Sequence, residues 1–197
     1  MIIHVIDDEH GMRESLRRLL FSEGYEVKLH SSGEAFLESY DGAPACVLLD
    51  LAMPCMPGEA LMEEIQQRKL NVAVLVLTGN ATIESAIRVT RAGALALLEK
   101  PFETDRLLSA LDDVSKQARP IFARNALVKD YQRRQASLTA SERKVMEFLL
   151  AGMTSQEIAS RLGNSKKTID IHRGRVMHKM GATSTAELIV QWTSLGR

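Results

Sequence analysis

The sequence predicts a doubly wound parallel α/β sheet of five strands, followed by a smaller domain built only from helices. Short unbroken apolar runs alternate with segments of helical periodicity across the first 118 residues, and beyond residue 137 the periodicity is helical throughout. Alternating strands and helices form a parallel sheet covered on both faces. A chain of 197 residues is long enough for two cores. We therefore expect domains at 1–118 and 138–197, joined by a linker at 119–137.

The first domain contains five strand-helix units in succession. The run at 47–49 is too unbroken for an amphipathic surface strand, so we interpret it as a central strand covered on both faces. Helical spacing of apolar residues predicts the helices between the runs. The expected strands are 2–6, 26–29, 47–49, 72–77 and 95–98, and the expected helices are one that closes at Gly24, then 33–40, 58–68, 82–91 and one from 104 onward.

Charge changes sign at the linker. Residues 1–119 carry 12 Lys and Arg against 19 Asp and Glu, a net charge of −7, whereas residues 120–197 carry 13 against 6, a net charge of +7. An acidic half joined to a basic half indicates two tasks, and the basic half is expected to face a polyanion.

The composition favours a cytoplasmic protein. Cys46 and Cys55 have neither a disulfide framework nor a metal-ligand spacing. No apolar run approaches the length of a membrane span, and the acidic residues at 7–9 follow the N-terminus too soon for a signal peptide. We therefore expect reduced cysteines and no membrane contact.

Polar residues stand at the ends of four of the expected strands. Right-handed crossovers place the carboxyl ends of all parallel strands at one edge, where ligands bind. We therefore expect one cleft that contains three carboxylates, a hydroxyl and an ammonium group. These groups belong to Asp7, Asp8, Asp50, Thr78 and Lys100.

This set of groups is suited to phosphoryl transfer. Clustered carboxylates repel one another unless a hard divalent cation such as Mg²⁺, or Mn²⁺, lies among them. An aspartate beside such a cation can attack a phosphoryl donor, while cationic and hydroxyl groups neutralise the transferring group. We expect Asp50 to accept the phosphoryl group, Asp7 and Asp8 to hold the metal, and Lys100 and Thr78 to contact phosphoryl oxygens.

The first domain resembles the receiver domain of two-component response regulators, which has a flavodoxin-like fold. The resemblance implies phosphoryl transfer from the phosphohistidine of a sensor kinase, slow self-dephosphorylation, and a metal ligand at the backbone carbonyl of Ala52. It also implies a switch in which Thr78 and an aromatic residue of the fifth strand move on activation. Leu97 stands at the aromatic position, so we expect activation to persist with a different signal on the face of this strand. The matching motifs are Asp7-Asp8, Asp50 with Met53-Pro54 and Gly58, Thr78-Gly79, and Lys100-Pro101-Phe102.

The segment at 119–137 is rich in cations and poor in large apolar side chains. Pro120 is expected to break any helix that leaves the first domain, and a short, weakly amphipathic helix is expected beyond it. We interpret the segment as a semi-rigid linker. The alternative, a coiled-coil dimer seam, lacks a sustained heptad.

Four helices are expected between 138 and 197. Capping residues precede the first three, and the third, with many cations, follows the second after a tight Gly163-Asn164 turn, which is typical of a helix-turn-helix. The last helix is expected at about 184–192. In the third helix His172 is expected to point inward. The candidate caps are Thr139 or Ser141, then Thr154 or Ser155, then Ser165.

The basic half resembles the LuxR-type DNA-binding domain of NarL/FixJ-type regulators. By that resemblance Asp170, Ile171 and Gly174 meet base edges; an aspartate can accept from cytosine N4 and an isoleucine can touch a thymine methyl. By analogy the last helix forms the dimer contact on an inverted repeat. Residues expected mostly at phosphates are Lys166, Lys167, Arg173 and Lys179. The motif that carries the resemblance is Leu138, Thr139, Glu142, Gly152, Ile158, Ala159, Leu162, Ser165, Thr168, Ile169, His172, Val176, Lys179 and Met180.

The two halves together predict a response regulator that dimerises when phosphorylated and regulates transcription, with activation the commoner outcome in the family. It is expected to catalyse only its own phosphorylation and dephosphorylation, and its expected partners are a sensor histidine kinase, promoter DNA, a second copy and RNA polymerase. One alternative is a LuxR-type regulator controlled without phosphate, for example by a small molecule, which would not need the acidic cleft. The other, a haloacid-dehalogenase-like phosphatase, would need a second acid where Ala52 stands.

Overall fold

The computed structural model describes residues 2–195 and divides between Phe122 and Ala123 into two compact units. The first residue of the domain predicted at 1–118 and the last two residues of the domain predicted at 138–197 lie outside the described residues.

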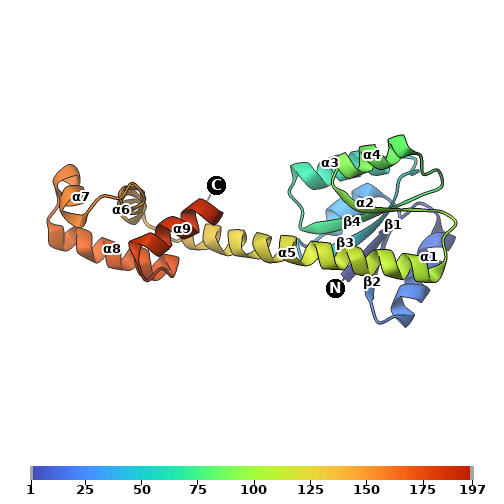
Figure 1. Cartoon of the computed structure of the whole chain (residues 1–197), viewed down its shortest axis with the longest axis horizontal. Coiled ribbons are helices and arrows are strands. Elements are labelled where there is room, and N and C mark those ends of the chain that lie inside the picture. The colour runs from blue at the N-terminus through green and yellow to red at the C-terminus, as the bar shows by residue number, and fades with distance from the viewer. Residues whose placement is uncertain (1, 196–197) are drawn as a thin grey trace. The chain divides into compact units, whose positions relative to one another are not determined.

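The first unit is a five-stranded parallel sheet in the order β2-β1-β3-β4-β5, with helices on both faces (Figure 1). This confirms the predicted fold class for the first half. The strands are β1 (Ile2–Ile6), β2 (Glu26–His30), β3 (Ala45–Asp50), β4 (Val72–Thr78) and β5 (Ala94–Glu99). The helices are α1 (His10–Ser22), α2 (Gly33–Ser39), α3 (Gly58–Gln67), α4 (Ile83–Arg91) and α5 (Thr104–Ala136).

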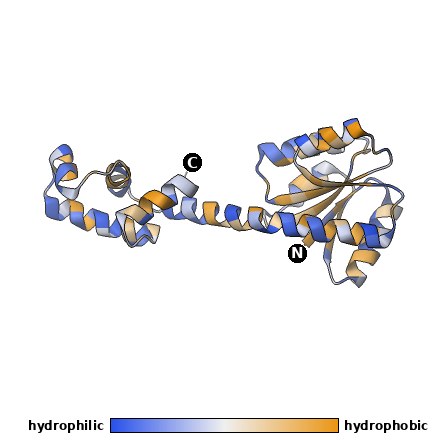
Figure 2. Ribbon diagram, in the orientation of Figure 1, coloured by the Kyte–Doolittle hydropathy of each residue, from blue (hydrophilic) through white to orange (hydrophobic). Residues whose placement is uncertain are grey.

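Apolar side chains pack on both faces of this sheet, and Figure 2 shows the strands coloured mainly as hydrophobic. Helices α1 and α5 cover one face, and α2, α3 and α4 cover the other. All six residues of β3 are buried, as expected for a central strand. The polar residue Asp50 is therefore carried on the most deeply embedded strand, whose end is fixed by packing on both sides.

Helix α5 continues through Pro120, so the prediction that this residue breaks the helix was wrong. Proline lacks an N–H donor and crowds the preceding turn, which disfavours a helix interior. However, Val114 and Ala118 are buried before Pro120, and Tyr131 is buried after it. Packing of both flanking segments against apolar cores stabilises a helical conformation that the local sequence disfavours.

The second unit consists of the end of α5 and four further helices, which confirms the predicted helical fold class. They are α6 (Ala140–Leu150), α7 (Ser155–Leu162), α8 (Lys166–Met180) and α9 (Thr185–Leu195). Thr139 and Thr154, not their alternatives two and one residues later, cap α6 and α7, and Ser165 caps α8. Gly163 lies in the left-handed region at φ 65°, which glycine tolerates without strain, and it allows the tight turn into α8.

The end of α5 is part of the core of this second unit. Tyr131 is buried with apolar residues of α6, α7 and α8. One N–H of the Arg134 guanidinium donates to the backbone carbonyl of Met180 at 3.0 Å, at the last residue of α8. A cation at this position is favourable, because the last carbonyl groups of a helix carry partial negative charge.

Candidate functional sites

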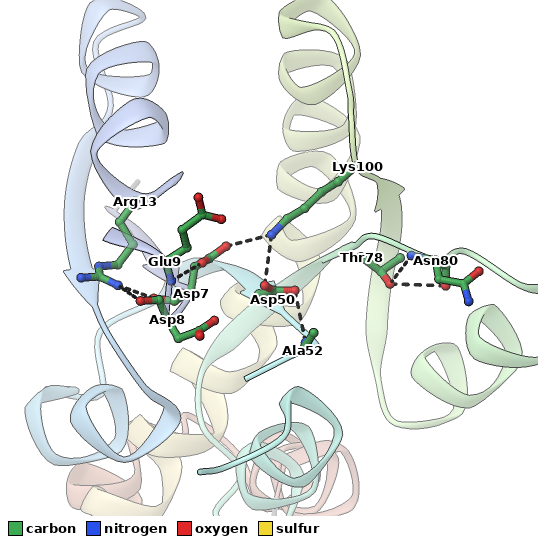
Figure 3. Close-up of polar contacts among 9 residues, drawn as sticks. All are labelled: Asp7, Asp8, Glu9, Arg13, Asp50, Ala52, Thr78, Asn80 and Lys100. Carbon is green, nitrogen blue, oxygen red and sulfur yellow. Dashed lines mark hydrogen bonds and ion pairs between the residues drawn. The ribbon is translucent and has the colours of Figure 1, made fainter. Parts of the chain in front are cut away.

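The ends of four strands bring the predicted cleft residues to one edge of the sheet. Asp7 and Asp8 follow β1, Asp50 ends β3, and Lys100 follows β5. Figure 3 shows the side chains of Asp7, Asp50 and Lys100 pointing toward one another. Thr78 ends β4 on the neighbouring side of the cleft.

Lys100 joins two of the carboxylates. Its Nζ lies 2.9 Å from Oδ2 of Asp7 and 3.1 Å from Oδ2 of Asp50, and the side chain of Asp7 is only 1% exposed. Burial alone would lower the pKa of Lys100, but the hydrogen bonds and negative charges of Asp50 and Asp7 outweigh it and raise that pKa. Lys100 is therefore a protonated ammonium group at neutral pH, held against the oxygen atoms that we expect to react or to bind metal.

The donor set of this cleft fits a hard divalent cation. One carboxylate oxygen from each of Asp7, Asp8 and Asp50 lies within 4.8 Å of the other two. One ammonium group neutralises three carboxylates only in part, and oxygen ligands in this number suit Mg²⁺. The backbone N–H of Ala52 donates to Oδ1 of Asp50 at 3.2 Å, so this loop turns back toward the carboxylates. Ala52 as a metal ligand stays a prediction.

Arg13, which belongs to none of the sequence motifs, holds the loop that carries Asp7 and Asp8. Its guanidinium donates to the backbone carbonyls of Asp7 at 2.7 Å and Asp8 at 2.9 Å (Figure 3). The backbone N–H of Glu9 donates to Oδ1 of Asp7 at 2.8 Å. Because these partners are backbone atoms whose direction depends on the loop, the sequence contains no signal for Arg13.

Position 58, which belongs to the Asp50 motif, requires a glycine for steric reasons. A Cβ at this position would lie 2.6 Å from the backbone oxygen of Asp50 and 2.8 Å from Cα of Leu51. Such distances require the backbone to move, so only glycine allows α3 to begin against the end of β3.

Thr78 is buried and is bonded to the loop that follows it. Its Oγ1 accepts the N–H of Asn80 at 3.2 Å and donates to the carbonyl of Asn80 at 3.4 Å (Figure 3). Leu97 packs against the apolar cluster that includes Val89 of α4. The two residues of the expected switch therefore lie on adjacent strands at the α4 face of the sheet, and their movement stays a prediction.

Helix α8 presents a polar surface on one side and a core surface on the other. Ile169, Val176 and Met180 are buried. His172 is partly buried, and its Nδ1 lacks a hydrogen-bond partner among residues 2–195. The predicted DNA contacts exposed on the other side are Lys166, Lys167, Asp170, Ile171 and Gly174.

The exposed residues of α8 differ in how they are held. Asp170 forms an ion pair with Lys166 at 3.2 Å, one turn earlier. Ile171 is half exposed, and open space surrounds the position that a Cβ at residue 174 would occupy. Arg173, which is partly buried, donates to Oγ1 of Thr185 at 3.1 Å.

Lys179 is engaged inside the domain. Its Nζ lies 2.6 Å from Oε2 of Glu142 and 3.0 Å from the carbonyl of Ser137. The hydrogen bond from Lys179, followed by that from the backbone N–H of Thr139, lowers the pKa of the Glu142 carboxyl to about 2. Lys179 thus joins α8 to α6, and its contact with a DNA phosphate stays a prediction.

None of the helices in the described part of the chain combines the length and the hydrophobicity that a membrane span requires.

An acidic cleft on a parallel sheet, joined to a helix-turn-helix, defines a signal-responsive DNA-binding protein. Residues 3–112 match the family model of the response regulator receiver domain, and residues 136–191 match that of the bacterial regulatory proteins of the luxR family. The chain belongs to the two-component response regulators that join a receiver domain to a LuxR-type DNA-binding domain.

Individual relatives agree with this assignment. The transcriptional regulatory protein FixJ of Bradyrhizobium diazoefficiens is 38% identical over 188 residues, which cover 95% of this chain and 92% of the relative. The structure of the response regulator StyR is 31% identical, with a TM-score of 0.74 over 98% of each chain. Full-length FixJ from B. japonicum is 37% identical, with a TM-score of 0.58 over 99% of this chain and 97% of that one. FixJ is a transcriptional regulatory protein, and this chain, with the same two domains, is a regulator of transcription.

Proposed function

We propose that Asp50 accepts a phosphoryl group from a sensor histidine kinase, and that the phosphorylated chain dimerises and binds promoter DNA. The observation that carries the proposal is the contact of Lys100 with both Asp50 and Asp7, beside a third carboxylate from Asp8. In this proposal residues 1–118 act as the receiver, residues 119–137 connect the two domains, and residues 138–197 bind DNA.

The residues of the cleft account for the chemistry of transfer. A carboxylate oxygen of Asp50 attacks the phosphorus of the donor, the bond from phosphorus to the kinase histidine breaks, and an acyl phosphate forms. Lys100 pairs with a phosphoryl oxygen, and Thr78 leaves Asn80 to donate to another. A divalent cation held by Asp7, Asp8, Asp50 and the carbonyl of Ala52 would supply additional positive charge. Slow hydrolysis of the acyl phosphate resets the chain.

The exposed apolar side chains of α4 support dimerisation through α4 and β5. Ile83 is 84% exposed and Ile87 is 48% exposed, one turn apart on the same helix. Covering both in a second copy would remove apolar surface from water. Leu97 of β5 lies beneath α4 and would change its packing when Thr78 moves. In the second domain Val190 of α9 is also largely exposed and would lie in the dimer contact on an inverted repeat.

The exposed side of α8 supports major-groove recognition. Asp170, Ile171 and Gly174 would meet base edges, and cations around them would meet phosphates. Binding in the cytoplasm near RNA polymerase would then activate transcription. The cations that would serve in this role are Lys166, Lys167, Arg173 and Lys179.

Phosphorylation tests the role of Asp50. The chain is incubated with a small radiolabelled phosphodonor and Mg²⁺, and wild type is compared with Asp50→Asn and with Asp41→Asn, an exposed aspartate outside the cleft. We expect labelling of wild type and Asp41→Asn and none of Asp50→Asn. Absence of label in wild type, or equal label in Asp50→Asn, would contradict the proposal. Promoter binding that is equal with and without phosphodonor would favour the regulator controlled without phosphate.

A further inference from the structure

Two polar contacts hold Asn80 and Ala81 in the loop between β4 and α4, at residues 79–82. The first joins the Thr78 hydroxyl to the backbone of Asn80. In the second the backbone N–H of Ala81 donates to Oε1 of Glu99 at 3.2 Å. The loop is therefore attached both to the end of its own strand and to the end of the neighbouring strand β5.

Glu99 and Lys100 are adjacent residues that contact different parts of the receiver. Glu99 ends β5 and lies beside Thr78 in the parallel register of β4 and β5. Lys100 reaches Asp7 and Asp50. Consecutive side chains of an extended chain point to opposite sides. One strand end therefore contacts both the acidic cleft and the loop that leads into α4.

The contacts of Asn80 and Ala81 support the same arrangement. For Thr78 to bind a phosphoryl oxygen on Asp50, its hydroxyl must leave Asn80, and the loop must accommodate the lost bond. Ala81 follows Asn80 directly, so a contact that fixes Ala81 opposes this movement. A hydrogen bond from an N–H to a carboxylate is stronger than one between neutral groups. The contact with Glu99 therefore favours the state in which Thr78 is bonded to Asn80.

We propose that Glu99 is a positioning residue whose carboxylate holds the 79–82 loop in the unphosphorylated arrangement and so limits dimerisation in the absence of phosphate. The proposal rests on the phosphorylation-dependent dimerisation proposed above. A contact present in one of two states shifts their equilibrium by its difference in free energy between the states. Both protomers of a dimer lose the contact, so its loss should strengthen self-association of the unphosphorylated chain about fivefold, which corresponds to about 1 kcal/mol per dimer, or about 0.5 kcal/mol per protomer.

Three variants of the full chain test this role by sedimentation equilibrium, without and with a small phosphodonor. Glu99→Ala removes the acceptor, whereas Glu99→Gln retains a side-chain oxygen that can accept the same N–H. Glu63→Ala is the matched control, because Glu63 is exposed on α3 and its carboxylate has no hydrogen bond among the described residues. Without phosphodonor we expect about fivefold tighter association for Glu99→Ala, and association close to wild type for Glu99→Gln and Glu63→Ala.

The outcomes separate this inference from the proposed function. Equal association of Glu99→Ala and wild type would overturn it, as would an equal rise in Glu63→Ala, which would report loss of charge alone. If wild type is labelled and dimerises with phosphodonor while Glu99→Ala behaves like wild type, only the role of Glu99 fails. If wild type is neither labelled nor dimerised, the proposed function fails instead.

Hydrogen exchange checks the contact itself and does not depend on dimerisation. The amide of Ala81 should be protected in wild type and in Glu99→Gln, and should exchange faster in Glu99→Ala at an unchanged midpoint of thermal unfolding. Unchanged protection of the Ala81 amide in Glu99→Ala would contradict the assigned contact. A general loss of stability would instead accelerate exchange throughout the sheet, which would also count against a local positioning role.

Discussion

The two proposed functional surfaces of this chain are constructed in opposite ways. The acidic cleft joins side chains from four strand ends, and its ion pair between Lys100 and Asp7 links residues 93 positions apart. The proposed DNA-binding surface takes its residues from α8, a single helix of 15 residues. In the cleft the charges contact one another, whereas on α8 most of the charged groups are exposed.

This difference determines how each surface responds to substitution. Groups that share partners act as a unit, so removing one changes several interactions at once. Separate exposed groups act almost independently, and each contributes a modest amount. We therefore expect single substitutions to have the largest effects in the cleft and intermediate effects on α8. Substitutions in the apolar core beneath α8 should have small effects.

Substitution of Lys100 should have the largest effect. Lys100→Ala removes the ammonium group that contacts both Asp7 and Asp50. We expect the initial rate of acyl phosphate formation to fall on the order of 10²-fold or more, as when one preorganised electrostatic contact is lost from a transition state. The measurement is incorporation of label from a small phosphodonor. The control is Lys116→Ala, which removes an exposed lysine of α5 and should react like wild type.

A rate for Lys100→Ala within about twofold of wild type would contradict the shared character of the cleft, since a preorganised contact contributes far more than that. The midpoint of thermal unfolding serves as a check, because Asp7 is buried and loses its cationic partner in this variant.

Two substitutions on α8 should have separable, intermediate effects. Asp170→Ala should relax base preference at one operator position, by about 1–3 kcal/mol of discrimination. Lys167→Ala should weaken binding to all sequences alike. It should also reduce the slope of log affinity against log salt concentration by about one, because one fewer counterion is released. Fluorescence anisotropy with a panel of single-base variants, at several salt concentrations, measures both. Lys144→Ala, exposed on α6, is the control for net charge.

If Asp170→Ala weakens binding equally at every operator position, Asp170 does not read a base. If Lys144→Ala matches Lys167→Ala in salt dependence, the basic surface extends beyond α8, and the contrast with the cleft becomes weaker.

The pair of Glu142 and Lys179 is an exception to the exposed character of α8, and its effect depends on pH. The pKa of Glu142 is lowered to about 2 in the folded domain by Lys179 and by the backbone N–H of Thr139. The stabilisation is therefore present at pH values above the ordinary pKa of a glutamate, about 4.3, and is lost as pH falls toward 2. We expect Lys179→Met to lower the unfolding midpoint at pH 6 and to have little effect near pH 2.

Fluorescence of Trp192, the single tryptophan of the chain, reports unfolding of the second domain. Lys167→Met is the matched control, because Lys167 is exposed on the same helix. A destabilisation by Lys179→Met that is equal at both pH values would show that the ion pair is not its cause.

The smallest effect is expected at Tyr131. Its side chain is 3% exposed, and its hydroxyl has no hydrogen-bond partner within residues 2–195. A buried hydroxyl without a partner costs free energy, so Tyr131→Phe should leave the free energy of unfolding unchanged or raise it by up to about 1 kcal/mol. Chemical denaturation followed at Trp192 measures this. A clear loss of stability would show that the hydroxyl binds water or another group.

The contrast between the two surfaces also explains what the sequence could predict. Asp7, Asp8, Asp50 and Lys100 were expected together because parallel topology alone brings strand ends to one edge. The exposed side of α8 followed from helical periodicity around Ile169 and the other buried positions. Both predictions used regular geometry, in which the position along the chain determines the direction of the side chain.

The residues that sequence reasoning missed depend on irregular geometry or on distant packing. Arg13 and Glu99 bind backbone atoms of loops, whose directions no periodicity specifies. Helix α5 passes Pro120 because both flanking segments are packed, which local propensity does not reveal. His4 and His30 share a hydrogen bond at 2.8 Å in the core, and burial, followed by the charge of His30, lowers the pKa of His4 to about 4.

The proposed signalling requires Asp50, and no other aspartate of the cleft, to be the phosphorylated residue. Wild-type chain treated with phosphodonor and Mg²⁺ is reduced with borohydride, which converts an aspartyl phosphate to homoserine, and the digested peptides are sequenced by mass spectrometry. We predict homoserine at position 50 and not at positions 7 or 8. Homoserine at either of those aspartates, or intact aspartate at position 50 in a labelled sample, would contradict the assignment of Asp50 as the phosphoryl acceptor.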